Sequence, residues 1–261
     1  MDKAKIEALG DALYQAMVER QPIAPLTEQE PSITIDDAYR ISLRMLELRE
    51  AAGARVVGKK IGVTSKAVMD MLDVRQPDFG YLTDDMMYAT GAEIPASSTL
   101  IAPRAEGEIA FVLKHDLMGP GVTNADVLKA TDFVMPCFEI VDSRIQDWKI
   151  KIQDTVADNA SCGVVVMGER GVSPLDVDLA TCGMVVELNG EIISTGAGAA
   201  ALGSPVNCVT WLANTLSAIG IGLKAGEIIL SGSLVPLQPV KPGDNMTVSV
   251  GGIGRCSVRF V

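Results

Sequence analysis

The chain has 261 residues, 48% of them hydrophobic, which is enough to bury the core of one large domain or two smaller ones. The formal net charge of −11, with no basic block, disfavours a nucleic-acid-binding protein. The N-terminus lacks the apolar centre of a signal peptide and no apolar run has the length of a membrane span, so we expect a cytoplasmic protein without a membrane segment.

The N-terminal part, residues 1–72, is predicted to be mainly helical. Apolar residues recur at helical spacing over residues 6–17. A second helix is expected over residues 36–52, because Thr34 and Asp37 have the spacing of a capping box. These two helices would form the smaller part of the molecule.

The segment VVGKKIGVTS, residues 56–65, predicts a short strand with glycine kinks, after which Ser65 is expected to cap a brief helix. In a strand, Lys59 and Lys60 must point to opposite faces, so at most one of them is expected to face the core. A buried Lys60 would suit a substrate carboxylate or an enolate oxygen. An exposed lysine pair is the alternative, and composition alone favours it.

Residues 73–261 predict a larger, β-rich body, in which short apolar runs alternate with turn residues. The segment MVVELNGEIIST predicts a hairpin with a type I′ turn at Asn189-Gly190. Two helices are expected to interrupt the strands, one after Thr123 and one after Ser204. The expected fold class is therefore α+β.

Two glutamates stand two residues apart in RAEGEIAFVL, where Glu106 and Glu108 must share one face of a strand. Glu139 lies in a second apolar strand, within VMPCFEIVDSR. A shared divalent cation would turn the mutual repulsion of three carboxylates into coordination, whereas glutamates at solvated strand ends need no ligand. His115 is the one histidine, so a metal would be held mainly by oxygen, which favours magnesium, manganese or calcium.

Several other features have ordinary structural interpretations. Asp78, in VRQPDFGYL, is typical of a turn, and His115 is expected in a surface loop without a catalytic role. The small-residue stretches 158–161 and 194–205 are either tight turns or loops around a small ligand. Five cysteines are scattered along the chain without a CxxC pair, and we interpret them as reduced thiols in the core: Cys137, Cys162, Cys182, Cys208 and Cys256.

Seven motifs follow one another along nearly the whole chain: GKKIGVTS, QPDFGYL, RAEGEIAFVL, FEIVDSR, DTVADNASCGV, GAGAAALGSP and GEIILSGS. Together they resemble the 2-keto-4-pentenoate hydratases (2-hydroxypenta-2,4-dienoate hydratases) of bacterial aromatic meta-cleavage pathways, within the fumarylacetoacetate hydrolase superfamily. The resemblance implies a mixed β-roll body with a smaller N-terminal α/β part. It also implies a Mg²⁺ or Mn²⁺ ion and site residues in three roles: metal ligands Glu106, Glu108 and Glu139; catalytic Lys60 and Asp78; substrate-binding Ser161 and Ser233.

The resemblance implies hydration of 2-hydroxypenta-2,4-dienoate to 4-hydroxy-2-oxopentanoate, with Lys60 and Asp78 handling charge and protons. The hydrolase branch of the superfamily uses a Glu–His pair, which His115 in its loop does not supply. The pattern QPDFG with Asp78 favours a hydratase over 4-oxalocrotonate decarboxylase. No insertion precedes the DNA motif at residues 158–160, which favours the short monocarboxylic substrate.

Two alternatives stay open at this point. The chain could be the 4-oxalocrotonate decarboxylase of the same pathway, because that reaction passes through the same kind of enolate. It could also be a non-catalytic accessory subunit of that decarboxylase, although the complete set of site residues argues against this. The resemblance further implies a homo-oligomer and a possible complex with the decarboxylase.

Overall fold

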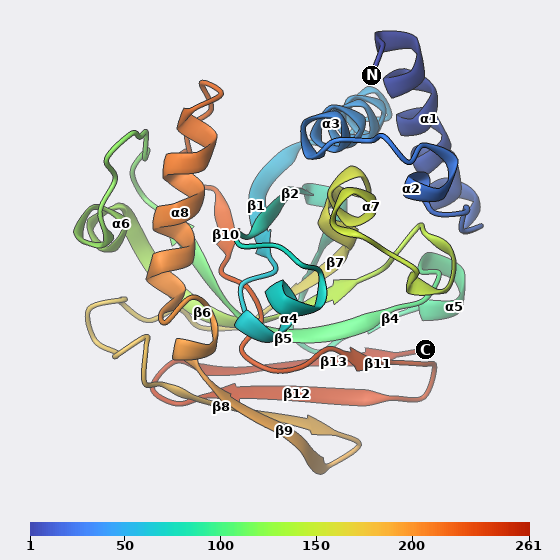
Figure 1. The fold of residues 1–261 in the computed structure, drawn as a ribbon. Coiled ribbons are helices and arrows are strands. Elements are labelled where there is room, and N and C mark those ends of the chain that lie inside the picture. Colours follow the sequence, from blue (N-terminus) through green and yellow to red (C-terminus); the bar gives the residue numbers. More distant parts are fainter.

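The computed structural model describes residues 1–261 and contains two β-sheets with helices packed around them (Figure 1). The expected α+β class is confirmed. None of the helices combines the length and the apolar character needed to cross a membrane.

The helices are α1 (Lys3–Glu19), α2 (Leu26–Gln29), α3 (Ile35–Ala51), α4 (Lys66–Met71), α5 (Ala96–Thr99), α6 (Asn124–Ala130), α7 (Ile152–Ala157) and α8 (Pro205–Ser217). The strands are β1 (Val56–Gly62), β2 (Asp78–Thr83), β3 (Met87–Ala89), β4 (Ala92–Ile94), β5 (Arg104–Leu113), β6 (Thr131–Val141), β7 (Cys162–Met167), β8 (Gly183–Leu188), β9 (Glu191–Ala197), β10 (Ile228–Leu230), β11 (Gln238–Pro239), β12 (Asn245–Val250) and β13 (Gly254–Phe260).

The N-terminal helices form where the sequence predicts them. The capping box at the start of α3 is confirmed, because Thr34 and Asp37 each accept a hydrogen bond from the other's backbone N–H. Ser65 caps α4 by accepting from the backbone N–H of Val68 at 3.3 Å. The apolar face of α1 is buried, and its members are Ile6, Leu9, Leu13 and Ala16.

That face of α1 packs with α3 and with the short helix α7. Residues far apart in sequence thus form a hydrophobic cluster that is separate from the main core of the sheets. Ile152 and Val156 of α7 belong to this cluster. The division of the chain after residue 72 stays a prediction. β1 precedes that point, yet it is hydrogen-bonded to β2 and β10, which follow it.

The larger sheet has eight strands in the order β2-β1-β10-β5-β6-β7-β3, with β11 paired to β5. β1 runs parallel to β10 and antiparallel to β2, whereas β5 and β6 form a long antiparallel pair. β1 is therefore an internal strand with neighbours on both sides. This position explains why the central side chains of β1 are buried on both faces of the sheet.

The smaller sheet has five strands in the order β4-β13-β12-β8-β9 and lies below the larger one in Figure 1. The predicted β8–β9 hairpin is confirmed, with φ of 54° at Asn189 and 86° at Gly190, as a type I′ turn requires. The two sheets approach closely at Gly107 of β5. A Cβ there would lie 2.7 Å from the sulfur of Met184, so a larger residue would require the Met184 side chain to move.

The two predicted helices of the β-rich body are also confirmed. α6 follows Thr123, which forms a capping box with Asp126. α8 follows Ser204, and α6 and α8 pack together at one side of the molecule (Figure 1). His115 is exposed in the loop after β5, as expected.

Candidate active site

Three glutamates come together in the middle of the larger sheet. Glu106 and Glu108 lie on β5, and Glu139 lies on β6 directly opposite Glu106. Because side chains alternate along a strand, all three point to one face. One ligand oxygen from each lies within 4.8 Å of the others. The interpretation as solvated glutamates at strand ends is wrong for Glu108 and Glu139, which are fully buried, whereas Glu106 is partly exposed.

These carboxylates are poorly satisfied by the protein. Glu108 and Glu139 are fully buried, and Glu108 accepts a single hydrogen bond, from the Gly232 backbone N–H at 2.8 Å. Neither oxygen of Glu139 has a hydrogen-bond partner, nor does Oε1 of Glu108. Burial and the charge of Glu139 raise the pKa of Glu106 to about 8, and burial raises the pKa of Glu108 well above its usual value.

The donor set fits a hard divalent cation. It consists of carboxylate oxygens alone, and neither a cysteine nor a histidine belongs to the group, which suits Mg²⁺, Mn²⁺ or Ca²⁺. Buried like charges that lack partners are costly, and a cation between them removes that cost. The orphaned oxygens of Glu108 and Glu139 therefore match what such an ion needs.

Lys60 on β1 is the positive neighbour of this cluster. It is buried, and its Nζ lies 3.2 Å from Oε1 of Glu139. Burial works to lower the pKa of Lys60, but the negative charges of Glu139, Asp78 and Glu106 outweigh it and raise that pKa. The ammonium group thus stays charged at neutral pH.

The expectation that at most one lysine of the pair faces the interior is wrong. Lys59 points to the opposite face of β1, yet it is buried as deeply as Lys60. Its Nζ lies 2.6 Å from Oε1 of Glu227 and 5.9 Å from the centre of the Tyr81 ring. The prediction failed because β1 is an internal strand covered on both faces, so each lysine needs an acidic partner.

Asp78 is not a surface turn residue but the buried first residue of β2, paired in register with Gly62. Its Oδ1 lacks a hydrogen-bond partner. A Cβ on Gly62 would lie 2.2 Å from that oxygen and 3.3 Å from Nζ of Lys60. The two charged groups therefore converge above the bare backbone of Gly62. Burial raises the pKa of Asp78, although Lys60 opposes this.

The two predicted substrate-binding serines differ in how far they are buried and in the hydrogen bonds that their hydroxyls already make. Ser161 is buried, with its hydroxyl 3.1 Å from that of Thr155. Ser233 is half-buried and donates its hydroxyl to the Val235 carbonyl at 2.7 Å. The sequence reasoning missed Ser231, which is fully buried and whose hydroxyl has no partner. Its position directly after the apolar strand β10 was the available signal.

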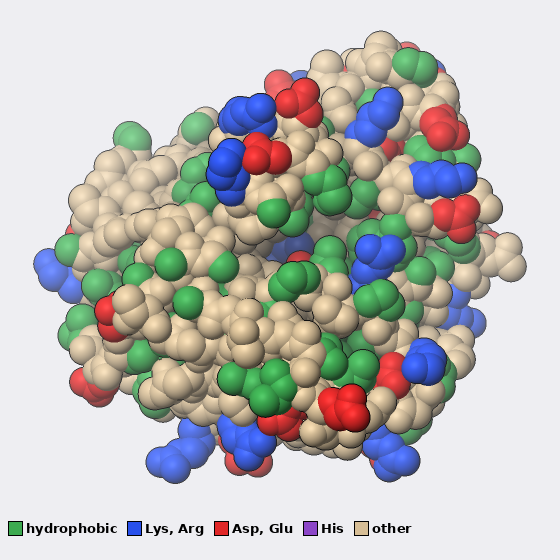
Figure 2. All heavy atoms as spheres, turned by 60° about the horizontal axis from the view of Figure 1, so that its bottom comes forward, with side chains coloured by type: hydrophobic (Ala, Val, Ile, Leu, Met, Phe, Trp, Pro, Cys, Tyr) green, Lys and Arg blue, Asp and Glu red, His purple; other side chains and the backbone are tan.

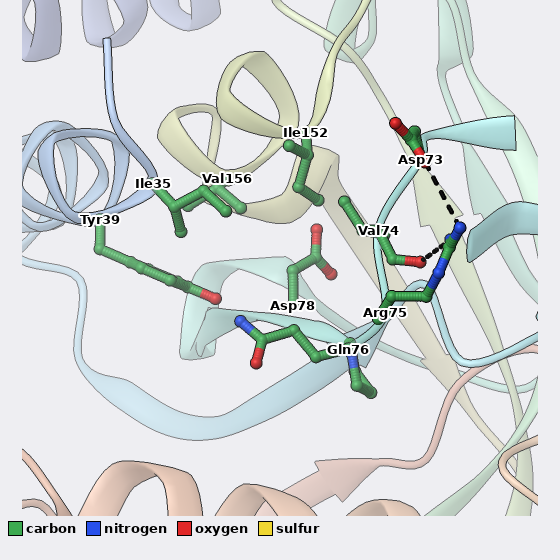
Figure 3. A pocket seen from close by; sticks show the side chains of 10 residues that line it. Ile35, Tyr39, Asp73, Val74, Arg75, Gln76, Asp78, Ile152 and Val156 are labelled. Atoms are coloured by element: carbon green, nitrogen blue, oxygen red, sulfur yellow. Dashed lines mark hydrogen bonds and ion pairs between the residues drawn. The ribbon is translucent and has the colours of Figure 1, made fainter. Parts of the chain in front are cut away.

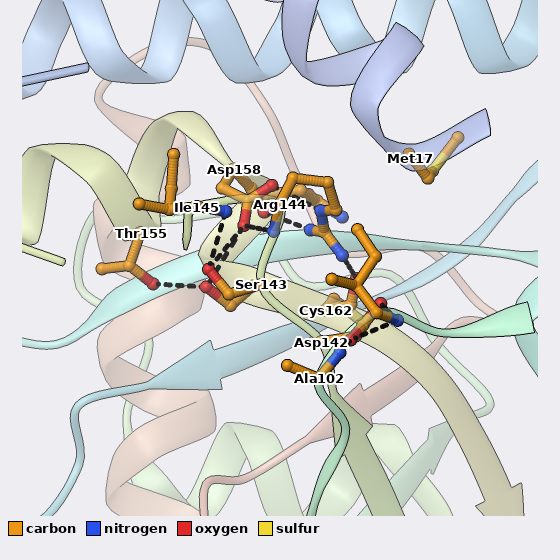
Figure 4. Close-up of polar contacts among 12 residues, drawn as sticks. Met17, Ala102, Asp142, Ser143, Arg144, Ile145, Thr155, Asp158 and Cys162 are labelled. Atoms are coloured by element: carbon orange, nitrogen blue, oxygen red, sulfur yellow. Dashed lines mark hydrogen bonds and ion pairs between the residues drawn. The ribbon is translucent and has the colours of Figure 1, made fainter. Parts of the chain in front are cut away.

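A buried polar network supports the turn that carries Ser161 (Figure 4). Arg144 forms an ion pair with Asp158 and donates to the carbonyl oxygens of Asp158 at 2.6 Å and Cys162 at 2.9 Å. Asn159 accepts from the Tyr81 N–H at 2.7 Å and donates to the Tyr81 carbonyl at 2.9 Å. This network ties the turn to β2, the strand that begins with Asp78. Neither Arg144 nor Asn159 was predicted from the sequence to have this role.

A cavity of about 320 Å³ opens next to Asp78, between α3, α7 and the loop before β2 (Figure 3). Its volume is at the lower end for small-molecule sites. In Figure 3, the hydroxyl of Tyr39 and the amide of Gln76 face one another near the Asp78 carboxylate. In the space-filling view, one face of the molecule is hollowed near its middle, with charged side chains visible inside (Figure 2).

The chain is similar to known proteins along its length. The model of the fumarylacetoacetate (FAA) hydrolase C-terminal family matches residues 51–261. A 2-hydroxypent-2,4-dienoate hydratase of Pseudomonas putida is 72% identical over 85% of this chain and 100% of its own length. A 2-hydroxyhexa-2,4-dienoate hydratase of Comamonas testosteroni is 59% identical, with 99% of this chain and 98% of the relative covered. The solved 4-oxalocrotonate decarboxylase of Pseudomonas putida G7, complexed with magnesium and adipate, is 39% identical, with a TM-score of 0.97 over 100% of this chain and 99% of its own.

Proposed function

This chain belongs to the fumarylacetoacetate hydrolase family, and from that premise we propose that its buried glutamate cluster is the centre of a hydratase site. The reaction is the addition of water to 2-hydroxypenta-2,4-dienoate, which gives 4-hydroxy-2-oxopentanoate, a step of aromatic meta-cleavage catabolism. The observation that carries the residue assignment is the convergence of three clustered carboxylates, in which Glu108 and Glu139 have oxygens without hydrogen-bond partners, with Lys60 and Asp78.

The metal ligands are Glu106, Glu108 and Glu139. A divalent cation, Mg²⁺ or Mn²⁺, bound there supplies a Lewis acid that favours the enolate form of a 2-oxo acid. Support comes from the oxygen-only donor set and from the magnesium in the solved relative. The glutamates would hold this cation next to Lys60, because Glu139 and Lys60 are in contact.

Lys60 stabilises negative charge on the substrate. Its raised pKa keeps an ammonium group in a buried position, where its field is weakly screened. Negative charge that develops on the 2-oxygen during enolisation is therefore stabilised without reorganisation of water.

Asp78 moves protons at the far end of the substrate. Its carboxyl lies beyond Lys60, on the side of the cavity, and burial raises its pKa towards the range in which a carboxyl exchanges protons. The 2-hydroxyl loses its proton to become the 2-oxo group, and a proton added at C5 leaves the remaining double bond between C3 and C4, in conjugation with that oxo group. Water then adds through its oxygen at C4, and C3 receives a proton. Asp78 serves this end as donor or acceptor.

The substrate carboxylate is assigned to serine hydroxyls. Ser161 and Ser233 are the residues that the resemblance implies, and Ser231 joins them because its hydroxyl is buried and free of other partners. Ser233 would first have to give up its hydrogen bond to Val235.

The partners and the location of the protein are inferred from its family. We infer a homo-oligomer in the cytoplasm that acts on a small 2-hydroxydienoate, with a possible complex with 4-oxalocrotonate decarboxylase. The similarity of the chain to a decarboxylase along its whole length supports related surfaces in the two enzymes.

The decisive experiment is an ultraviolet assay with freshly made 2-hydroxypenta-2,4-dienoate and Mg²⁺ or Mn²⁺, with and without chelator. We expect metal-dependent loss of dienoate absorbance with formation of 4-hydroxy-2-oxopentanoate. A parallel assay contains 4-oxalocrotonate. Release of carbon dioxide from oxalocrotonate, without hydration of the dienoate, would instead identify a decarboxylase. Loss of neither substrate would identify a non-catalytic subunit.

A further inference from the structure

We infer that the cavity beside Asp78 receives the C5 end of the substrate and selects dienoates with an uncharged alkyl end over dicarboxylic ones. This inference rests on the proposed function, because it assumes that the other end of the substrate lies at the glutamate cluster. It adds the residues that decide which dienoates are accepted.

The position of the cavity follows from three contacts in series. Glu139 of the cluster contacts Lys60 at 3.2 Å. Lys60 and Asp78 converge above Gly62, and Asp78 lines the cavity. Asp78 lines the cavity, whereas Lys60 and the three glutamates do not, so a substrate whose 2-oxygen lies at the cluster reaches this space by extending past Lys60 and Asp78.

Two helices supply most of the apolar part of the cavity wall, while Asp73, Arg75, Gln76 and Asp78 supply its polar part. α3 contributes Ile35 and Tyr39, and α7 contributes Ile152 and Val156. Each pair is spaced four residues apart, so both of its members lie on one face of the helix. The half-buried Val74, from the loop before β2, completes the apolar wall. In Figure 3 these side chains surround the carboxyl group of Asp78.

The cavity offers no suitable cation for a second carboxylate. Arg75 is the one basic residue that lines it, and this side chain is 74% exposed. Its guanidinium already donates to the Val74 carbonyl at 2.8 Å and lies 3.4 Å from a carboxylate oxygen of Asp73. Asp73, which also lines the cavity, adds negative charge at its exposed rim. A carboxylate at the C5 end would thus lose hydration and meet like charge.

An alkyl group at the C5 end, unlike a carboxylate, is expected to bind favourably against the apolar side chains of the cavity. An additional methylene in an apolar pocket changes kcat/KM by roughly 10- to 200-fold. The volume of about 320 Å³ leaves room for more than the terminal carbon of a five-carbon dienoate.

The test compares kcat/KM for 2-hydroxyhexa-2,4-dienoate and 2-hydroxypenta-2,4-dienoate in the native enzyme and in Val74→Phe, which narrows the cavity from its half-buried wall. We expect the six-carbon to five-carbon ratio to fall at least about tenfold. Ile35→Phe, also half-buried, is the second variant. Val177→Phe is the matched control, because this half-buried valine lies outside the cavity, near Gly252, and should leave the ratio unchanged.

A native-enzyme measurement accompanies the variants. Inhibition constants are determined for 2-oxohexanoate and for 2-oxoadipate, which has a carboxylate at the corresponding end. We expect 2-oxohexanoate to bind at least about tenfold more tightly. Equal inhibition by both compounds, or an unchanged substrate ratio in active Val74→Phe and Ile35→Phe enzymes, would overturn the inference. Failure of the native enzyme to hydrate either dienoate would instead overturn the proposed function.

Discussion

The carboxyl group of Asp78 is buried with one oxygen unpartnered, next to a charged Lys60. Asp78→Asn keeps the shape of this group but removes its ability to exchange a proton. We expect kcat/KM for hydration to fall by about 10²- to 10⁴-fold, as for the loss of a general acid or base. The dissociation constant for Mn²⁺, measured by calorimetry, should change little, since Asp78 is not one of the three clustered glutamates.

The control for this prediction is Asp70→Asn, an exposed aspartate on the nearby α4, which should retain full activity. Equal losses of hydration and of Mn²⁺ binding in Asp78→Asn would show that Asp78 is a ligand or a structural residue. Its assigned role in proton transfer would then be wrong.

Gly62 allows Asp78 and Lys60 to approach each other. In Gly62→Ala, the added Cβ would lie 2.2 Å from Oδ1 of Asp78, so the carboxyl group must move. We expect at least about a tenfold loss of kcat/KM and a destabilisation of about 1–3 kcal/mol, measured by urea denaturation. Gly183→Ala is the matched control, since nothing lies within 4 Å of its Cβ position. Similar stability and activity in both variants would contradict this role of Gly62.

At the scale of single residues, the sequence predicted side-chain direction better than burial. Strand alternation correctly placed Glu106 and Glu108 on one face. It did not reveal that Asp78 and Lys59 are buried, because their burial depends on neighbouring strands and helices distant in sequence. The unpartnered Ser231 was missed for the same reason: a hydroxyl lacks partners only in a particular three-dimensional setting.

At the scale of elements, the turn at residues 158–161 joins α7 to β7 and depends on Arg144. Arg144→Met would leave Asp158 buried without its ion pair. Removal of one partner of a buried pair destabilises proteins by about 3–5 kcal/mol, and we expect a loss of that size in urea denaturation. The turn also holds β2 through Asn159, so kcat/KM for hydration of the dienoate should fall as well.

Arg170→Met serves as the control for Arg144→Met, because Arg170 is exposed and its replacement should change stability by less than about 0.5 kcal/mol. If Arg144→Met were no less stable than this control, the ion pair with Asp158 would not hold the turn.

Elements that depend on local signals were predicted well. The capping boxes at Thr34 and Thr123 and the hairpin turn at Asn189-Gly190 use residues within a few positions of one another, and the structure confirms them. The strand order was not predicted, because β1 and β10 are neighbours although most of the chain separates them. The hydrogen bonds between Asn159 and Tyr81 are non-local in the same way.

At the scale of the whole molecule, the glutamate cluster couples cation binding to folding. The raised pKa of Glu106, about 8, means that the metal-free folded protein holds a proton that the unfolded chain releases near pH 4.5. Between these values the folded state binds more protons, so its free energy of unfolding falls as the pH rises. Carboxylates with a lowered pKa, such as Asp37 at about 2, titrate below this range and do not contribute to the slope.

We therefore expect urea denaturation in chelator to show decreasing stability from about pH 6 to about pH 8. Saturating Mg²⁺ should reduce this slope, because the cation requires ionised carboxylates and displaces their protons. At a concentration about 100 times its dissociation constant, Mg²⁺ should add about 2.7 kcal/mol. Glu106→Gln should reduce the slope in chelator, leaving the part that comes from Glu108, and should weaken the Mg²⁺ effect. Stability that is independent of pH and of Mg²⁺ in the native chain would mean that the cluster does not bind the cation.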